Sequence, residues 1–156
     1  MVPEHVAREI LIDAPVEVVW AVVTEPEHLG RWLGDTAAID LRPGGALRLT
    51  YGEHGVIRGR VERVEPPHFV SFHWAFSARE GGAGVEVREG NATLVEFRLT
   101  AEGAGTRLRV VESGFARLDG TADENARYAE DHGRGWEREL GELRDYVATV
   151  RGAARR

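Results

Sequence analysis

The last third of the chain carries an apolar stripe that predicts one long helix. Between Thr121 and Val150, residues of low polarity recur at alternating spacings of three and four: Ala126, Ala129, Gly133, Trp136, Leu140, Leu143, Val147 and Val150. This spacing places all eight residues on one face of an α-helix. Thr121 and Glu124 match a capping box at the start of that helix. The sequence therefore predicts a long terminal helix with one buried face.

The members of this stripe change in size along the helix. The first three are Ala126, Ala129 and Gly133, and the five that follow are large. Because protein interiors are close-packed, small residues indicate either a very close approach of another backbone or a space left open beside the helix. We take the second alternative as our prediction: a cavity beside these three residues, closed on the sheet side by Phe72, Trp74 and Phe97.

The residues before the long helix predict one strand, two short helices and about six further strands. Residues 6–12 alternate loosely as an opening strand, and Pro15 suits the first position of a helix. Thr24 and Glu27 match a second capping box, for a short helix that ends before Gly34. Period-two patterns then follow at Leu47, Leu49 and Tyr51, over 56–64, at Val70, Phe72 and Trp74, at Val95, Phe97 and Leu99, and at Leu108 and Val110, with a glycine-rich connection over 77–91. Consecutive strands with short connections pair antiparallel, so we expect an α+β domain whose curved sheet packs on the long helix.

Composition narrows the class of protein. A chain of 156 residues fits a single domain, 1–156, with a sizeable core. The net charge of -6 argues against nucleic acid as a partner, and the absence of cysteine excludes disulfides and thiolate chemistry. No signal peptide or apolar run long enough for a membrane span is visible, so we expect a cytoplasmic protein. The six histidines are isolated from one another, and we expect neither a metal nor a cofactor.

Several short segments, in this order, resemble a known superfamily. They are 14–20, Trp32, 42–45, 65–67, Trp74, 105–108, 113–115, 135–136, Leu140 and Leu143. The chain resembles the START/Bet v 1-like (SRPBCC) superfamily, in the branch related to the C-terminal domain of the Hsp90 ATPase activators. The resemblance implies the helix-grip fold, with an apolar cavity between sheet and helix. In that superfamily the cavity serves to bind lipids, aromatics or polyketides or to carry out cyclase-type chemistry, and some members dock a chaperone. Fold alone does not choose among these functions.

The candidate ligand-binding residues are those expected to face the helix or to lie on its inner side. They are Leu49, Tyr51, Phe72, Trp74, Phe97, Val110, Glu112, Phe115, Asn125, Ala129, His132, Gly133 and Trp136. Ligand pockets are mostly apolar with a few placed polar groups, which this set matches. The alternative is that the aromatic side chains simply fill a dry core.

Glu112 and His132 are the two candidates for catalysis. Glu112 shares strand parity with Leu108 and Val110, so it should point inward, where it could orient a ligand hydroxyl or act as an acid or base. The alternative is that the strand ends there and Glu112 meets solvent or an arginine. His132 lies at the rim of the helix face, where a histidine is either solvated or placed to reach a ligand.

We predict that the protein binds or sequesters a small apolar or aromatic molecule in the cavity, and the sequence favours a carrier over an enzyme without deciding between them. A cyclase- or hydrolase-type enzyme would instead need Glu112, His132 or Tyr51 to converge on one ligand. A chaperone-docking module is the third alternative. The ligand and the oligomeric state are left open by the sequence.

Overall fold

The computed structural model describes residues 2–52, 55–75 and 86–154. In chain order its elements are β1 (His5–Ile12), α1 (Val16–Thr24), α2 (Pro26–Trp32), β2 (Thr36–Ile39), β3 (Ala46–Tyr51), β4 (Gly55–Glu65), β5 (Phe69–Ala75), β6 (Ala92–Glu102), β7 (Gly105–Ser113), a 3-10 turn (Phe115–Arg117) and α3 (Ala122–Ala154). The predicted connection over 77–91 falls largely outside the described residues. The short strand β2 had no pattern of its own in the sequence, because it is only four residues long and contains two alanines.

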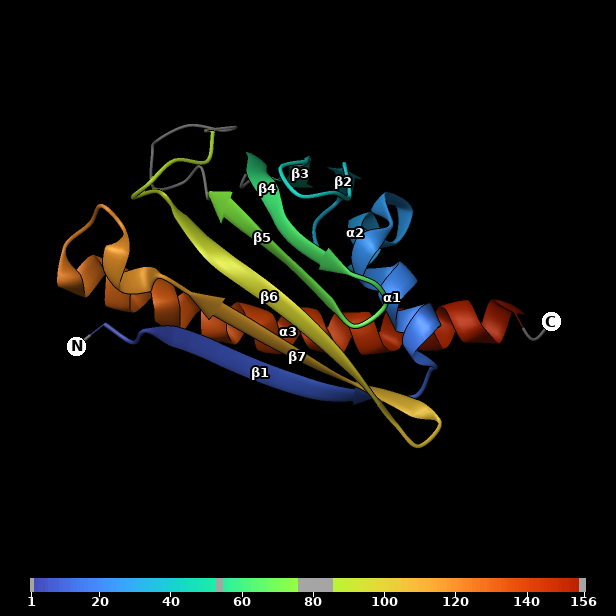
Figure 1. Ribbon diagram of the computed structural model, residues 1–156. Coiled ribbons are helices and arrows are strands. Elements are labelled where there is room, and N and C mark those ends of the chain that lie inside the picture. Colours follow the sequence, from blue (N-terminus) through green and yellow to red (C-terminus); the bar gives the residue numbers. More distant parts are fainter. Residues whose placement is uncertain (1, 53–54, 76–85, 155–156) are drawn as a thin grey trace.

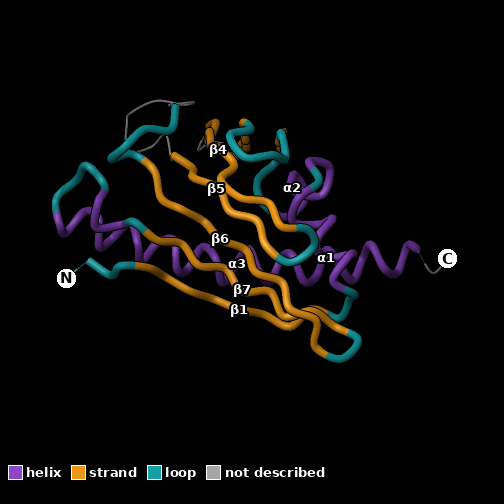
Figure 2. The backbone as a smooth tube through the Cα atoms, viewed as in Figure 1, coloured by secondary structure: helices purple, strands orange, loops and turns teal. Residues whose placement is uncertain are grey.

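The seven strands form one antiparallel sheet in the order β1-β7-β6-β5-β4-β3-β2. From β2 to β7 each strand pairs with its neighbour in sequence, and β1 closes the sheet beside β7. The helix α3 runs along one face of the sheet, and α1 and α2 lie toward its C-terminal half (Figure 1). Figure 2 shows the strands curving over that helix. The predicted α+β helix-grip fold is confirmed.

One of the two predicted capping boxes is present. The Thr121 backbone N–H donates to Oε1 of Glu124 at 2.9 Å, and the Glu124 backbone N–H donates to Oγ1 of Thr121 at 3.1 Å. The capping box predicted at Thr24 is absent. Thr24 is the last residue of α1, and its hydroxyl donates to the Trp20 carbonyl. The helix α2 begins instead at Pro26, whose fixed φ suits a first helical position without a side-chain cap.

Four of the five large members of the helix stripe lie in the main core, as the spacing predicted, whereas Val150 near the end of α3 is only half-buried. Trp136, Leu140, Leu143 and Val147 are buried among side chains of the sheet and of α1 and α2. The rings of Phe72 and Trp74 are in edge contact, and Trp136 packs against both Trp74 and Phe97. The aromatic side chains of the sheet therefore meet the first large residue of the stripe directly.

Among the described residues, Ala129 and Gly133 pack against neighbouring side chains and Ala126 is half-buried, so the predicted position of the cavity is wrong. Ala129 is fully buried in a second cluster with Phe115 and Leu118. A Cβ added to Gly133 would lie 2.8 Å from the Arg8 guanidinium of β1. The space beside these residues is therefore filled by side chains of β1 and of the segment after β7, and not by another backbone or by an open cavity.

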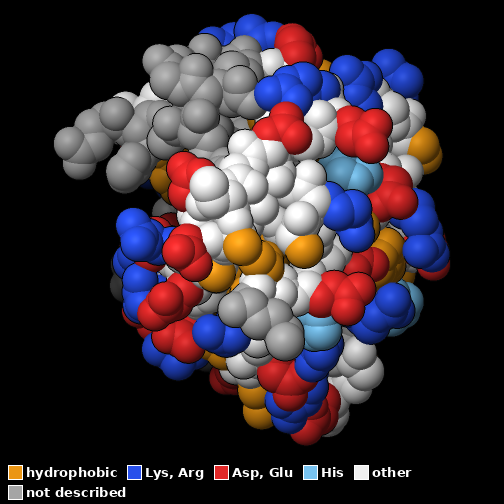
Figure 3. Space-filling model, turned by 90° about the vertical axis from the view of Figure 1, so that its left-hand side faces the viewer, with side chains coloured by type: hydrophobic (Ala, Val, Ile, Leu, Met, Phe, Trp, Pro, Cys, Tyr) orange, Lys and Arg blue, Asp and Glu red, His pale blue; other side chains and the backbone are white. Residues whose placement is uncertain are grey.

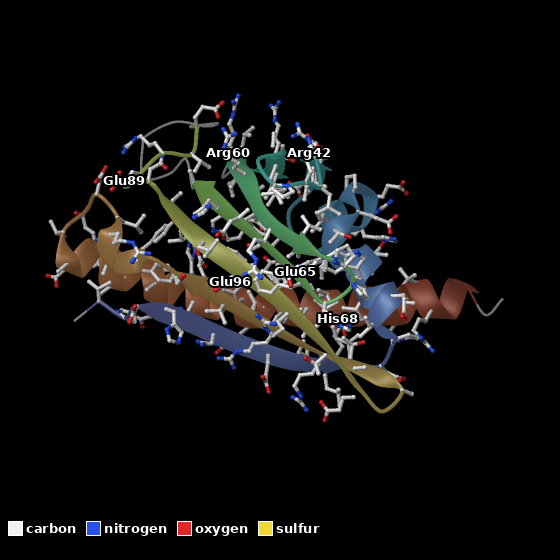
Figure 4. The ribbon with its side chains drawn as sticks, in the orientation of Figure 1. Arg42, Arg60, Glu65, His68, Glu89 and Glu96 are labelled. Atoms are coloured by element: carbon white, nitrogen blue, oxygen red, sulfur yellow. The ribbon has the colours of Figure 1, made fainter. Side chains whose placement is uncertain are left out.

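The opposite face of the sheet is polar. Arg60, Glu65 and Glu96 alternate along their strands with inward-facing residues and project on the side away from α3 (Figure 4). The end of the molecule seen in Figure 3 carries acidic and basic side chains interspersed around small hydrophobic groups. No helix in the described part of the chain combines the length and the apolar character that crossing a membrane requires.

Candidate functional site

A pocket of about 350 Å³ lies between α3 and the sheet. The α3 residues that line it are not the small residues beside which the sequence predicted a cavity. Tyr51 from β3, Trp74 from β5 and Leu33, which follows α2, form its sheet side. The middle of α3 forms the other side, with Tyr128, Asp131, His132, Gly135, Trp136, Arg138 and Glu139. Its volume is at the lower end of the range that ligand pockets usually have.

Two tryptophans, Trp74 from the sheet side and Trp136 from α3, meet in this pocket and form an aromatic wall where its two sides join. The rings of Trp74 and Trp136 are stacked at 16° with their centroids 5.5 Å apart. Both side chains are almost completely buried, at 3% exposure each, so the wall is held rigidly by the core behind it. Rigid aromatic surfaces of this kind contribute contact area at little cost in conformational entropy, which suits them to planar ligands.

Glu112 lies directly behind this wall and is completely buried. Its Oε2 accepts a hydrogen bond from Nε1 of Trp74 at 3.0 Å and one from the Thr93 hydroxyl. Its Oε1 accepts a bond from Nε1 of Trp136 at 2.8 Å, and Nδ1 of His132 lies 2.8 Å from both oxygens. The prediction that Glu112 points inward is confirmed, and the alternative partners, solvent or an arginine, are replaced by two tryptophan N–H groups, a hydroxyl and a histidine.

The hydrogen bonds around Glu112 determine its protonation state. Burial by itself would raise the pKa of Glu112, but the charge of His132 and the bonds from His132, Thr93 and Trp74 outweigh burial and hold that pKa below its ordinary value. Glu112 is therefore a carboxylate, and a carboxylate only accepts hydrogen bonds. It follows that His132 carries a proton on Nδ1.

His132 is held between aromatic rings at the rim of the pocket. Its centroid lies 4.1 Å from that of Tyr128 and 5.9 Å from that of Phe115, and its ring meets Trp74 edge-on at 6.2 Å. The side chain is 11% exposed. Since Glu112 engages Nδ1 from behind the wall, the imidazole ring is held in one orientation at the rim of the pocket.

The opposite end of the pocket holds a second buried acid, Glu139. Burial and the charge of Glu142 together raise the pKa of Glu139 to about 8, against an opposing effect of Arg138. Its Oε2 is buried and accepts no hydrogen bond from the residues that the structure describes. Burial and the charge of Glu139 also raise the pKa of Tyr51. At neutral pH this end of the pocket therefore presents a neutral carboxyl and a neutral phenol.

The predicted site residues fall into three groups. Tyr51, Trp74, His132 and Trp136 line the pocket, and Glu112 supports it from behind. Leu49, Phe72, Phe97 and Val110 belong to the main core, and Phe115 and Ala129 belong to the second cluster. The remaining two lie away from the pocket wall, since the Asn125 amide donates to the Leu118 carbonyl and Gly133 faces Arg8.

Sequence reasoning missed the pocket residues Leu33, Tyr128, Asp131, Gly135, Arg138 and Glu139. A signal for four pocket positions was present, because Tyr128, His132, Gly135 and Glu139 recur at spacings of four, three and four. This second stripe runs beside the apolar one and contains the polar groups and a glycine. Within the described ranges, no group of three or more His, Asp or Glu side chains is arranged to hold a metal ion.

A curved antiparallel sheet gripping a long helix, with an aromatic pocket between them, defines a START/Bet v 1-like domain. The model of one family, "Activator of Hsp90 ATPase homolog 1-like protein", matches residues 13–148. The chain therefore belongs to this family. No curated protein matches the chain significantly.

Solved structures with the same fold are numerous. DynU16, a protein of the dynemicin biosynthetic locus, is 25% identical with a TM-score of 0.75, over 95% of this chain and 48% of DynU16. Protein MLL2253 from Mesorhizobium loti is 23% identical with a TM-score of 0.75, over 93% of this chain and 97% of its own. Aha1 from Colwellia psychrerythraea, solved as a dimer, is 18% identical with a TM-score of 0.71, over 92% of this chain and 95% of its own. The chain spans about half the length of DynU16.

Proposed function

We propose that this protein binds a small planar aromatic molecule in the pocket between α3 and the sheet. The observation that carries the proposal is the stacked pair Trp74 and Trp136, which forms one wall of a pocket of about 350 Å³. A flat apolar molecule gains most from such a wall, because ring–ring stacking adds to the free energy of removing apolar area from water. The volume suits a molecule of two or three rings.

The polar groups of the pocket would set the orientation of this ligand. His132 and Glu139 are seven residues apart on α3, which corresponds to about 10 Å along a helix axis. A ligand lying along the helix between them would meet one polar group near each end and the aromatic wall in the middle. This division between apolar walls and a few placed polar groups is typical of small-molecule sites.

The relatives support a small-molecule role without defining the ligand. DynU16 is a protein of a biosynthetic locus, and we carry over to this chain only the expectation that its ligand is a small organic molecule. The family name also refers to activation of the Hsp90 ATPase. A chaperone partner remains a prediction, since the features of the pocket do not require one.

Gly135 offers a direct test of binding. A Cβ added there would meet only the Arg138 guanidinium, at 3.9 Å, so the position opens onto the pocket. Gly135→Leu should fill part of the pocket and weaken binding of the fluorescent probe N-phenyl-1-naphthylamine at least tenfold, an effect of about 1.4 kcal/mol. It should not destabilise the protein, because leucine is a better helix former than glycine.

Gly141 provides the matched control on the same helix. A Cβ there meets nothing within 4 Å, and the residue does not line the pocket. Gly141→Leu should raise stability by a similar amount and leave probe affinity within about twofold. If the two variants bind the probe equally well, or if the wild-type protein does not bind it, the pocket is not the binding site.

A further inference from the structure

Glu139 differs from the other polar residues of the pocket because its burial is not compensated. The residue retains only 9% exposure, and its Oε2 is closed off from solvent. No donor in the part of the chain that the structure describes reaches this oxygen. Arg138 is a weak partner, because its Nη2 lies 3.7 Å from Oε1, beyond the usual hydrogen-bond distance, and its side chain is mostly exposed. Buried polar groups are almost always hydrogen-bonded, so a bound ligand is the expected source of a donor for Glu139.

A second acid, Glu142, favours a positively charged donor. It lies three residues after Glu139 on α3, and residues at this spacing are neighbours on a helix surface. Burial, together with the charge of Glu142, raises the pKa of Glu139 to about 8, against the opposing effect of Arg138. A hydroxyl group would satisfy one oxygen atom, whereas a cation would also offset the repulsion between the two acids. This end of the pocket therefore suits a cationic group better than a neutral one.

The aromatic wall lies one helical turn from this acid. Trp136 precedes Glu139 by three residues on α3, and both side chains line the pocket. The faces of tryptophan rings attract cations as well as flat apolar groups. The terminal torsion of a glutamate side chain is soft, so a rotation of the carboxyl group can turn Oε2 toward the pocket. A ligand that packs against the wall can thus present a positive group to Glu139.

We propose that the planar ligand of this pocket carries an amino group that is protonated at neutral pH, and that the carboxylate of Glu139 binds this group. The inference rests on the proposed function, because the ring of the ligand must occupy the aromatic pocket. On binding, the O–H bond of the Glu139 carboxyl group breaks, its electron pair stays on oxygen, and the proton passes to solvent. The ammonium group then donates a charge-assisted hydrogen bond to the carboxylate.

Release of a proton is the expected signature of this arrangement. With a pKa of about 8, Glu139 is mostly protonated at pH 7 before the ligand binds, and a neighbouring cation lowers that pKa. Nearly one proton per bound ligand should therefore be released at pH 7. The other titratable and charged groups around the pocket are Asp131, His132, Arg138 and Glu142 on α3, Tyr51 on β3, and Glu112 behind the wall.

The test compares two naphthalene probes of nearly the same shape. 1-Naphthylmethylamine is cationic at neutral pH, and 1-naphthalenemethanol carries a neutral hydroxyl in place of the amine. Isothermal titration calorimetry of the wild-type protein at pH 7 should show that the amine binds at least about tenfold more tightly, which corresponds to 1.4 kcal/mol. Titrations in buffers of different ionisation enthalpy should show that the amine releases nearly one proton and the alcohol none.

Glu139→Gln keeps the shape of the side chain and removes its charge. It should bring the affinities for the amine and the alcohol to within about twofold of each other and abolish the release of the proton. Glu137→Gln is the matched control, because it removes the same charge from the same helix. Glu137 is exposed, pairs with Arg8 and does not line the pocket. This control should keep both the wild-type preference for the amine and the release of the proton.

The outcomes separate this inference from the proposed function. Equal affinities for the two probes in the wild-type protein, binding of the amine without release of a proton, or a preference that persists in Glu139→Gln overturns the inference. N-phenyl-1-naphthylamine is uncharged at neutral pH, so its binding in any of these cases leaves the proposed function standing. Failure of all three probes to bind overturns the two proposals together.

Discussion

Replacing Glu112 by glutamine removes one charge from the centre of the buried network and is expected to destabilise the protein strongly. The carboxylate accepts from Trp74, Trp136, Thr93 and His132. A glutamine amide has one oxygen to accept and one NH₂ group that can only donate. In either orientation its NH₂ group faces the N–H of Trp74 or that of Trp136, which leaves at least one buried donor unsatisfied.

The size of the loss follows from these contacts. An unsatisfied buried donor costs about 1–3 kcal/mol, and the remaining bonds fall from charge-assisted to neutral strength, a loss of roughly 1 kcal/mol each. Relief of the burial cost of the charge offsets part of this sum. We expect a net loss of about 3–5 kcal/mol, as for other broken buried charge networks. For a domain of this size that corresponds to a fall in Tm of roughly 6–20 °C.

Urea unfolding followed by tryptophan fluorescence at pH 7 measures this loss. Glu130→Gln is the control, because Glu130 is exposed and its ion pair with Arg134 should contribute about 0.5 kcal/mol or less. The pKa of Glu112 is lowered on folding, so its stabilising contribution is present above the unfolded value of 4.5 and is lost as the pH falls through the lower folded value. The difference between wild type and Glu112→Gln should therefore narrow in acid. A loss below about 1 kcal/mol at pH 7 would refute the assignment of Glu112 as an ionised acceptor for four donors.

Three further variants test other parts of the structure. The pKa of Glu139 rises from 4.5 to about 8 on folding, so the stability of the protein should fall as the pH rises from 4.5 to 8. Glu139→Gln should therefore raise Tm at pH 8 but not at pH 4.5. An unchanged Tm at pH 8 would contradict this. Trp136→Ala should cost about 3–5 kcal/mol in urea unfolding, because the ring is buried against Trp74 and its N–H is needed by Glu112, and a loss near zero would contradict its place in the core. Ala129→Phe should destabilise the protein by about 1–3 kcal/mol through overpacking. It should leave binding of N-phenyl-1-naphthylamine unchanged, because Ala129 does not line the pocket. Loss of binding without loss of stability would instead support the cavity that the sequence predicted beside Ala129.

The fold could be predicted from the sequence because its signals are local and periodic. The three-four stripe from Ala129 to Val147 specifies the buried face of α3, and the alternation in Phe72 and Trp74 specifies the inner face of β5. The inward direction of Glu112 followed from the same strand parity that predicted Val110 to be buried. Each of these inferences needs only the repeat of a helix or a strand.

The position of the pocket depended on tertiary contacts that no periodic pattern encodes. Ala129 and Gly133 could border either an open space or a closely packed chain, and only the placement of β1 against α3 decided for the second. The four donors that meet at Glu112 come from β5, β6 and α3, segments far apart in the sequence. Strand parity predicts that a carboxylate is buried, but its ionisation depends on which distant groups surround it. The sequence alone therefore determined the architecture and the buried faces, whereas the tertiary structure decided where space remains and how its polar groups are charged.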